Sequence, residues 1–239
     1  MKINRIAPEQ DYVNKLFTEI TDCYDKMNTI MTFGMHHLWK TKLIKLVSSR
    51  KPTICVDIAT GTGDISYKLA QIPTVTNVYA TDILMPMLQI AKSKKIELLH
   101  ANNPTFFVST AIELPLQDNI TDAVTAGFSL RNMPNLQKSI SEMVRITKPG
   151  GIVATLELTP YKNKFAGMFI GFYFRKIVPI IGLLISKNKS AYTYLPQSVD
   201  KFITAEELKS VFESCGLEKV SFKKFGLGTI AIHHGIKPL

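Results

Sequence analysis

The sequence is short of cysteine and of acidic side chains. Its three cysteines, Cys23, Cys55 and Cys215, are odd in number and far apart among 239 residues, which excludes a disulfide framework and favours reduced core residues in a cytosolic protein. The sequence also shows no cluster of Cys and His at ligand spacing, so we expect no metal. The sequence has 29 Lys and Arg residues but only 19 Asp and Glu residues, so its formal charge is +10. That charge calls for an anionic partner: nucleic acid, an acidic membrane surface or an acidic substrate.

Other absences narrow the class of protein further. The N-terminal stretch lacks the apolar core of a signal peptide, and there is no internal repeat or low-complexity tract. No nucleic-acid-binding motif accompanies the basic charge, so we expect no nucleic acid partner. With 46% hydrophobic and 20% charged residues, the chain is globular, and its length suits one α/β domain with an additional element.

We expect the chain to be organised around residues 56–64, V-D-I-A-T-G-T-G-D. An apolar run ends in Asp57, and Gly61 and Gly63 then precede a helical pattern, the order typical of the cofactor turn in a doubly wound sheet. A phosphate-binding P-loop would need Lys after Gly63, where Asp64 stands. A diphosphate here would face Asp57 and Asp64. S-adenosylmethionine (AdoMet) has no phosphate and carries a sulfonium and an ammonium group, so the acids favour AdoMet.

Alternating apolar runs and helical patterns predict a mixed α/β sheet. The expected parallel strands are residues 53–58, 77–81, 105–109, 123–127 and 152–158. Thr204 and Glu207 predict a capping box for a C-terminal helix. Residues 218–224 and 229–233 predict a terminal antiparallel hairpin.

Two polar residues follow expected strands at the edge where ligands bind in such sheets. Asp82 ends the second strand, close to where an acid meets a ribose diol; the alternative is a helix N-cap. We favour the ribose role because the glycine turn lies upstream. Arg131 follows the fourth strand, where chemistry is expected, and a surface or capping arginine is the alternative.

The N-terminal region has apolar side chains at helical spacing over residues 13–27 and again over 39–47. These helices either pack simply on the domain or form a lid over a substrate pocket. In a lid, the side chains expected to face inwards are Tyr24, Asp25, Asn28 and His36. The pattern alone favours simple packing.

Residues 165–185 are apolar and aromatic, between flanking lysines. Arg175 and Lys176 divide the segment into two short halves and Pro179 breaks the second, which argues against a transmembrane helix of about 20 uninterrupted apolar residues. Two interpretations stay open. The segment is either a buried helical hairpin, or an interfacial element or gate for a lipid-like substrate whose basic flank meets anionic lipid.

Several short motifs, in their order along the chain, resemble those of one enzyme family. They are Tyr24-Asp25-x-Met27-Asn28, Phe33-Gly34-x-His36-x-x-Trp39-Lys40, Asp57-x-Ala59-x-Gly61-Thr62-Gly63-Asp64, Glu113-Leu114-Pro115, Leu130-Arg131-Asn132, Lys148-Pro149-Gly150-Gly151 and Ile232-His233-His234-Gly235. Over nearly its whole length the chain resembles the AdoMet-dependent methyltransferases of menaquinone and ubiquinone biosynthesis, the family of demethylmenaquinone methyltransferase and 2-methoxy-6-polyprenyl-1,4-benzoquinol methylase. The glycine turn and K-P-G-G are shared by many class I methyltransferases. The first two motifs and L-R-N are particular to quinone methylases.

The resemblance implies a fold and a division of the chain. The fold would be the class I methyltransferase Rossmann-like α/β fold, a seven-stranded mixed sheet with helices on both faces. Within a single domain, residues 1–50 would form a helical lid over the quinol and 51–160 the cofactor-binding core. Residues 161–203 would be an apolar substrate- or membrane-facing insertion, and 204–239 the C-terminal helix and hairpin.

The resemblance also implies where AdoMet binds. Thr62 and its glycines would contact the methionine end, Asp82 the ribose, and Thr110 and Ala111 the adenine. The full set implied is Asp57, Gly61, Thr62, Gly63, Asp82, Ile83, Thr110, Ala111 and Gly127. Thr110 stands where the family usually has Asn or Asp, and Gly127 where some members have Ser.

The reaction implied is C-methylation of a polyprenyl quinol, with demethylmenaquinol as the favoured acceptor and the ubiquinone-pathway benzoquinol as a second. The enzyme must align the reacting atoms and stabilise a phenolate. We expect Arg131 to be the cation beside the phenolate, acting electrostatically or through a water. Asn132, Tyr24 and His36 would position the quinol or relay its proton.

The resemblance sets expectations about partners and leaves alternatives open. We expect a polyprenyl quinol substrate and an anionic membrane surface as partners of a cytoplasmic, peripherally membrane-associated protein, with a homodimer left open. One alternative is a class I methyltransferase for another apolar phenol or a sterol-like acceptor. The other is an AdoMet-binding membrane-surface protein whose catalytic residues have decayed.

Overall fold

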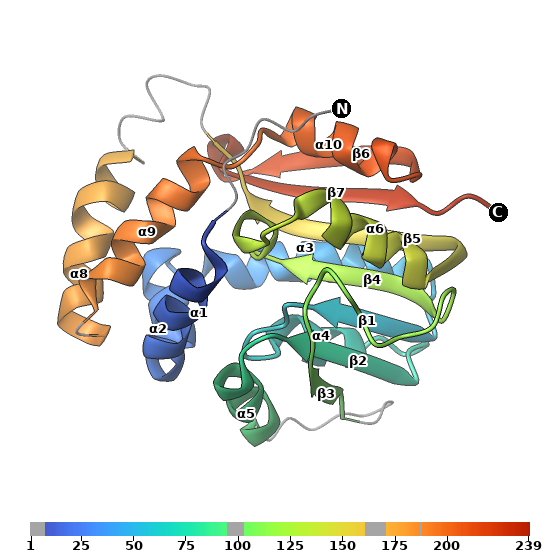
Figure 1. Cartoon of the computed structure of the whole chain (residues 1–239), viewed down its shortest axis with the longest axis horizontal. Coiled ribbons are helices and arrows are strands. Elements are labelled where there is room, and N and C mark those ends of the chain that lie inside the picture. The colour runs from blue at the N-terminus through green and yellow to red at the C-terminus, as the bar shows by residue number, and fades with distance from the viewer. Residues whose placement is uncertain (1–7, 95–102, 161–170, 187) are drawn as a thin grey trace.

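The computed structural model describes residues 8–94, 103–160, 171–186 and 188–239, which contain a seven-stranded sheet (Figure 1). The strands are β1 (Ile54–Ile58), β2 (Asn77–Asp82), β3 (Thr105–Val108), β4 (Thr121–Gly127), β5 (Thr147–Leu158), β6 (Glu218–Phe225) and β7 (Ile230–Ile236). Their order is β3-β2-β1-β4-β5-β7-β6, with β1 to β5 parallel and β7 antiparallel between β5 and β6. The predicted mixed sheet with its terminal antiparallel hairpin is confirmed.

Helices cover both faces of the sheet, because successive side chains of a strand point to opposite sides. In β1, Cys55 packs against the helices of one face and Val56 against those of the other. These helices are α3 (Met35–Ser48), α4 (Asp64–Ala70) and α5 (Met85–Ser93) on the first face, and α6 (Leu136–Ile146) and α10 (Ala205–Ser214) on the second. The start of α10 is the predicted capping box: the Thr204 hydroxyl accepts from the Glu207 N–H, and the Glu207 carboxylate accepts from the Thr204 N–H.

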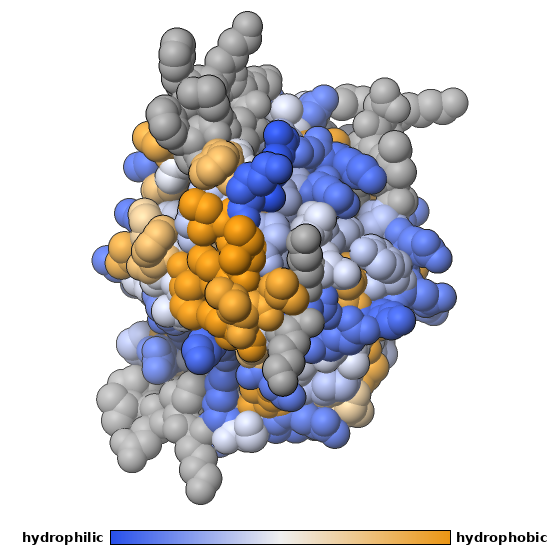
Figure 2. Space-filling view, turned by 90° about the vertical axis from the view of Figure 1, so that its left-hand side faces the viewer, coloured by the Kyte–Doolittle hydropathy of each residue, from blue (hydrophilic) through white to orange (hydrophobic). Residues whose placement is uncertain are grey.

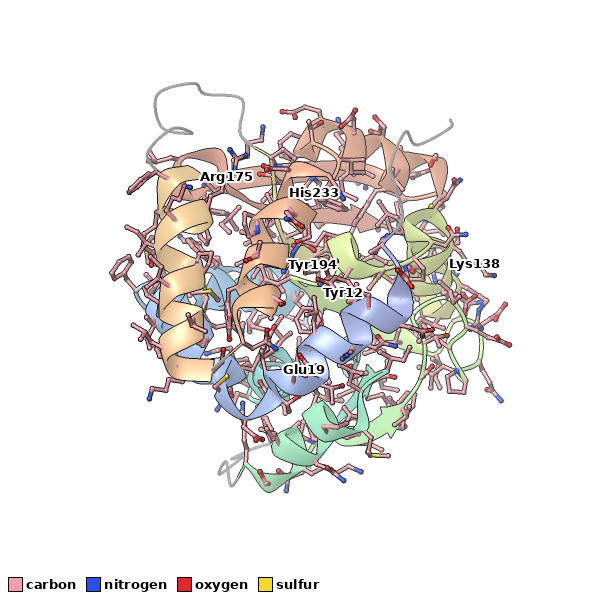
Figure 3. The ribbon with its side chains drawn as sticks, turned by 60° about the vertical axis from the view of Figure 1, so that its left-hand side comes forward. Tyr12, Glu19, Lys138, Arg175, Tyr194 and His233 are labelled. Atoms are coloured by element: carbon pink, nitrogen blue, oxygen red, sulfur yellow. The ribbon has the colours of Figure 1, made fainter. Side chains whose placement is uncertain are left out.

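A second, smaller core lies beyond the carboxyl ends of the parallel strands, on the left in Figure 1. Its elements, which we call the cap, are α1 (Gln10–Glu19), the 3₁₀ turn η1 (Thr21–Cys23), α2 (Tyr24–Met31), the π-helical turn η3 (Tyr173–Ile177), α8 (Val178–Ser186) and α9 (Lys189–Asp200). Tyr12 of α1 and Tyr194 of α9 meet edge to face with ring centroids 6.0 Å apart (Figure 3). Glu19 accepts a hydrogen bond from Asn188 at 2.6 Å. Two distant parts of the sequence therefore form one cap.

The cap differs from the expected lid in two respects. Residues 13–27 do not form one helix, because α1 ends at Glu19 and η1 intervenes; the Thr21 hydroxyl there donates to the Phe17 carbonyl and competes with the helical pattern. In addition, α3 packs into the sheet core through Trp39 and Leu43. Residues 1–50 therefore contribute both to the cap and to the core of the sheet.

The apolar segment is continuously helical over residues 171–186 rather than divided into two halves. Proline lacks an N–H and crowds the carbonyl four residues earlier. For Pro179 that carbonyl belongs to Arg175, inside η3, where a π turn already departs from the four-residue bonding pattern. The predicted break at Pro179 is therefore wrong. Residues 165–170 of the segment lie outside the described residues, and no helix in the described ranges is long and apolar enough to cross a membrane.

The packing of α8 on α9 gives a testable prediction, because a Cβ on Gly182 would collide with the Tyr192 ring. We expect Gly182→Ala to lower the free energy of unfolding of the cap by about 1–3 kcal/mol through overpacking. Gly171→Ala is the control, since a Cβ there meets nothing within 4 Å and alanine favours a helix. Thermal unfolding and hydrogen exchange over α8 and α9 measure the difference, and equal responses of the two variants would contradict this packing.

Candidate active site

Two cavities meet where the cap covers the carboxyl ends of the parallel strands. The larger has a volume of about 560 Å³ and extends beneath the cap, and the smaller, of about 210 Å³, lies beside the end of β2. The residues that line both cavities, which we call the junction, are Phe17, Tyr24, Ala59, Gly61, Gly127 and Phe128. Ligands in the two cavities would therefore meet at the junction.

The glycine turn after β1 shapes this junction. Gly61 and Gly63 have φ angles of 57° and 82°, which L side chains rarely adopt. A Cβ on Gly63 would also lie 3.1 Å from the Cβ of Ala91 in α5. At Gly127 a Cβ would collide with the Ile65 side chain, so glycine keeps the junction open. The structure thus brings Gly61 and Gly127 together at the junction, whereas Gly63 packs against α5 and lines neither cavity.

The smaller cavity has the residues predicted to contact ribose and adenine on its wall. They are Asp82, Ile83, Thr110 and Ala111. The buried Asp82 carboxylate accepts from the backbone N–H groups of Gly61 and Leu84 at 2.8 and 2.9 Å, and burial raises its pKa despite these bonds. Leu84, not Asp82, is the N-cap residue of α5. Among the described residues, the lining includes no Lys, Arg or His, so this wall offers no cation to a diphosphate.

Asp57 is buried at the end of β1 and lines the larger cavity. Its carboxylate accepts hydrogen bonds from the hydroxyls of Thr60, Ser66 and Thr125 at 2.7, 2.8 and 2.7 Å. Burial nevertheless raises the pKa of Asp57. A cation that approached this carboxylate would favour its ionised form.

Asp64 takes part in a chain of ion pairs that joins the cap to the glycine turn. Lys40 of α3 and Lys94 bond its two oxygens at 2.8 Å each, and Lys94 also bonds Asp25 of α2 at 2.8 Å. Asp25 in turn accepts a hydrogen bond from the buried Thr62 hydroxyl at 2.6 Å. Burial would raise the pKa of Asp64, but the two ammonium groups outweigh it and lower that pKa. The negative charge of Asp64 is therefore already compensated by lysines of the protein. We had expected this carboxylate to face the cation of a cofactor.

Three possible metal ligands lie together beside this ion-pair chain, although the sequence pattern did not indicate them. One atom each from His36, His37 and Asp64 lie within 4.8 Å of one another. Both Asp64 oxygens are already bonded to ammonium groups, so a divalent cation would have to displace a lysine or lie beside two positive charges. The cluster is therefore an unfavourable metal site.

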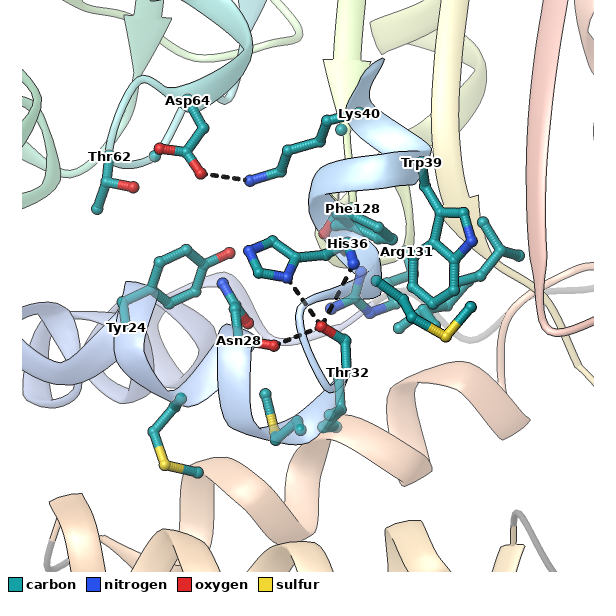
Figure 4. Close-up of a pocket in the computed structure, with 18 of the residues that line it drawn as sticks. Tyr24, Asn28, Thr32, His36, Trp39, Lys40, Thr62, Asp64, Phe128 and Arg131 are labelled. Carbon is teal, nitrogen blue, oxygen red and sulfur yellow. Dashed lines mark hydrogen bonds and ion pairs between the residues drawn. The ribbon is translucent and has the colours of Figure 1, made fainter. Parts of the chain in front are cut away.

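His36 is held in one tautomer by Thr32 (Figure 4). The Thr32 hydroxyl donates its proton to the Asn28 carbonyl oxygen at 2.7 Å, so it accepts from the Nδ1–H of His36, 2.8 Å away. The lone pair of the ring then lies on Nε2, and Figure 4 shows the ring beside Tyr24. Burial, followed by the Lys40 ammonium, lowers the pKa of His36 to about 4. The ring is therefore neutral near pH 7.

The other predicted catalytic residues are not all in one place. Tyr24 lies at the junction, where its hydroxyl bonds the Asn28 side chain and burial raises its pKa. Asn132 lines only the smaller of the two cavities, and its amide oxygen accepts from the Tyr194 hydroxyl at 3.1 Å. The structure therefore separates Asn132 from the larger cavity, which Tyr24, His36 and Arg131 line.

Arg131, in η2 (Leu130–Asn132), is buried and paired with the fully buried Glu157. Its Nη1 bonds Glu157 Oε1 at 2.7 Å, and Oε2 accepts from the Arg131 backbone N–H at 3.1 Å. Nη1 also donates to the Phe128 carbonyl oxygen, and Nε donates to the Ser198 hydroxyl. Phe128 has a φ of 58°, rare for a bulky residue. Arg131 therefore helps to hold a left-handed residue at the junction.

The sequence analysis did not identify Glu157 as a site residue, although its position in the sequence is unusual. It is a carboxylate in the largely apolar second half of strand β5, and a charge buried in such a strand requires a partner. Because Glu157 balances Arg131 inside the protein, the pair weakens the case for Arg131 as the cation of a phenolate. No comparable sequence feature marked Phe128 as a residue of the site.

The sheet order, the glycine turn after β1 and the acid after β2 define a fold of the class I AdoMet-dependent methyltransferase type. Solved structures share it: a Thermotoga maritima SAM-dependent methyltransferase described as a possible histamine N-methyltransferase is 18% identical, with a TM-score of 0.64 and coverage of 93% of this chain and 99% of that one. The [4+2]-cyclase SpnF is 16% identical, with a TM-score of 0.66 and 98% coverage of both chains.

The chain belongs to the ubiE/COQ5 methyltransferase family, whose family model matches residues 5–237. A Rickettsia bellii relative named ubiquinone/menaquinone biosynthesis C-methyltransferase UbiE is 38% identical over 233 residues, which cover 96% of this chain and 94% of the relative. The expected family and fold are confirmed.

The buried Arg131–Glu157 pair gives a second testable prediction. We expect Glu157→Ala to cost about 3–5 kcal/mol of stability, because it leaves a buried guanidinium without its counter-charge. The double variant Arg131→Met/Glu157→Gln should recover part of that loss, since it removes both charges and keeps one amide oxygen to accept from the backbone N–H of position 131. Chemical denaturation measures both variants.

The exposed pair of Arg175 and Asp200, 2.6 Å apart, provides the control. Asp200→Ala should cost at most about 1 kcal/mol, as for other surface pairs. A loss for Glu157→Ala no larger than for Asp200→Ala would contradict the role given to the buried pair.

Proposed function

We propose that this chain transfers a methyl group from AdoMet to a ring carbon of a polyprenyl quinol, with demethylmenaquinol as first candidate and the ubiquinone-pathway benzoquinol as second. The observation that carries the proposal is the pair of joined cavities. The smaller presents a carboxylate and no cation among its described residues, and the larger extends beneath the apolar cap. The name and near-complete coverage of the Rickettsia relative support the same acceptor class.

The residues at the smaller cavity and the junction fit AdoMet. Asp82 has carboxylate oxygens for ribose hydroxyls, and Thr110 and Ala111 lie where an adenine would follow. Asp57, whose pKa burial raises, suits the ammonium group because a nearby cation stabilises its charged form. When bound, AdoMet supplies a methyl group already activated on a sulfonium.

His36 is our candidate for the group that accepts the quinol proton. A quinol ring carbon becomes nucleophilic when a neighbouring hydroxyl loses its proton, and Nε2 of the neutral His36 ring has the lone pair to accept it. With a pKa of about 4, the ring is a weak base, so the transfer requires a cation beside the phenolate. Lys40, which lines the same cavity, is placed to supply it, because it shares the single carboxylate of Asp64 with Lys94 and that acid does not balance both lysines.

The remaining predicted residues would position the substrates. Tyr24 keeps its phenol proton because burial raises its pKa, and it can donate a hydrogen bond at the junction. Arg131 holds Phe128 through its carbonyl oxygen, and Asn132 acts from the side of the smaller cavity. In this proposal Arg131 is a positioning residue, and its charge remains balanced by Glu157.

Attachment to an anionic membrane surface forms part of the proposal. The left-hand face of the molecule shows an apolar patch where α8 lies (Figure 2). Exposed apolar side chains of η3 and α8 are Ile177, Ile180, Leu183 and Leu184. With the formal charge of +10, this face would bind acidic lipid peripherally.

Vesicle binding tests the membrane contact. We expect the protein to sediment with anionic vesicles, less so at high salt because screening weakens the attraction. Leu183→Ser/Leu184→Ser should lower the bound fraction, and Val108→Ser, which alters an exposed residue of β3, is the control. Absence of binding at low salt would contradict the proposal.

Methyl transfer itself is tested with purified protein, labelled AdoMet and a panel of polyprenyl naphthoquinols and benzoquinols kept reduced. We expect label on a ring carbon of at least one quinol. Label on another phenol or a sterol, with none on any quinol, would favour the alternative acceptor class.

A pH profile of single-turnover methylation tests His36. His36→Phe should lower the rate by about 10²–10⁴, the range for loss of a general base. Because burial and Lys40 lower the pKa of His36 to about 4, the active neutral ring persists as pH falls and is lost only near that value. Lys40→Met removes one of the causes, so the acid limb should move to higher pH.

Lys45→Met, an exposed substitution on the same helix, is the control and should leave the acid limb in place. If Lys40→Met also leaves it unchanged, His36 is not the titrating group.

A further inference from the structure

Three apolar side chains in the wall of the larger cavity are exposed to solvent. Among the described residues that line it, Phe33, Met35 and Leu227 are the exposed ones, at 81%, 43% and 77%. None of the three lines the smaller cavity, so they are not part of the junction. A substrate with its reacting ring at the junction would therefore extend towards these three residues, which we call the mouth.

Two residues of the mouth have an unusual backbone conformation. Phe33, between α2 and α3, has a φ of 49°, and Leu227, in the η4 turn (Gly226–Gly228), has a φ of 56°. A left-handed conformation is disfavoured for a residue with a Cβ. It is rare for bulky apolar residues and tends to occur at functional sites. Two separate turns thus each hold a large apolar side chain in solvent along the wall of one cavity.

The surroundings of the mouth suit a lipid surface. The Phe33 ring lies 5.9 Å from the Tyr173 ring, at the start of the helical run that continues into α8. On the other side, the ammonium groups of Lys42 and Lys223 lie 5.2 and 5.9 Å from the ring of Phe225. Apolar side chains bordered by ammonium groups match acyl chains bordered by acidic headgroups.

We propose that the polyprenyl tail of the substrate leaves the larger cavity between Phe33 and Leu227, which contact it as it passes into the lipid. This inference rests on the proposed function and adds the path of the tail. Neither side chain belongs to one of the apolar cores of the described residues. Contact with the tail would explain why both are exposed. The quinol ring would enter while its tail remains in the acyl layer.

The single tryptophan of the chain, Trp39, provides a binding probe, because it lines the larger cavity and lies against the η4 turn. The ligands are redox-inert naphthoquinol analogues with a brominated alkyl tail, an unbrominated tail or no tail, in non-ionic micelles. We expect the brominated tail to quench Trp39 fluorescence more than the unbrominated one. Equal quenching by the two tails would overturn the proposal.

Two substitutions test the flanking residues. In Phe33→Asn/Leu227→Asn, asparagine tolerates the left-handed backbone, so thermal stability should hold. The ratio of affinities for the tailed and tailless analogues should fall about tenfold, because loss of apolar contact to one large side chain is enough for that change. Leu38→Asn is the control: Leu38 is 60% exposed on α3 and does not line the cavity, so the ratio should hold.

The tail path would be overturned if the ratio of affinities for the tailed and tailless analogues were the same in the double variant and in wild type. The proposed function would stand in that case, provided that wild type methylates quinols. Failure of wild type to bind any analogue or to methylate any quinol would overturn the proposed function as well.

Discussion

The ion-pair chain around Asp64 is the interaction on which the closed site depends. Asp64 follows the glycine turn, Lys40 belongs to α3, Lys94 follows α5, and Asp25 belongs to α2. These charges lie partly out of water, so removing one partner leaves another without compensation. The chain therefore holds α2 and α3 over the turn.

The same chain affects the chemistry of its surroundings. Lys40 binds Asp64 and also contributes to the low pKa of His36. Asp25 binds Lys94 and accepts a hydrogen bond from the hydroxyl of Thr62. Burial is the main cause of the low pKa of His36; within the chain Lys40 lowers that pKa further, whereas Asp64 and Asp25 raise it.

The acids of the site fall into two groups according to their partners. Asp64 and Glu157 are each bonded to cationic side chains of the protein. Asp57 and Asp82 accept only hydroxyl and backbone N–H groups among the bonds described, and burial raises the pKa of both. A cation or a pair of hydroxyls from a ligand would stabilise the second group. The first group maintains the shape of the site, and the second is suited to contact a ligand.

Local signals made much of the fold predictable from the sequence. The five parallel strands were visible as apolar runs, and Thr204 with Glu207 indicated the start of α10. The π turn at η3 was not visible, because proline rules assume a regular helix around Pro179. Similarly, α1 ends at Glu19 and η1 follows, although apolar spacing alone would have continued the helix.

Site residues could be predicted from the sequence where the order of strands fixes their position. Their partners could not be predicted where these come from distant parts of the chain. Gly61, Asp82 and Thr110 lie at strand ends, so topology alone brings them to one edge. The charge of Arg131 was predictable, but its balance by Glu157 depends on β4 and β5 lying side by side with a fixed register. The two lysines that pair with Asp64 lie 24 and 30 residues from it in the sequence. No local sequence pattern could predict these pairs.

The cap, rather than the sheet, must determine the acceptor. A methyltransferase and a [4+2]-cyclase match this fold with TM-scores of 0.64 and 0.66, so the sheet and glycine turn leave the reaction open. The sheet edge and α3 form part of the wall of the larger cavity, and the cap adds α1 and α2 together with η3 and α9. These two parts of the cap are separated by most of the sheet in sequence and form one small apolar core, so their share of the wall exists only after the sheet has brought them together. Acceptor choice is therefore a property of the tertiary structure, which no single motif can specify.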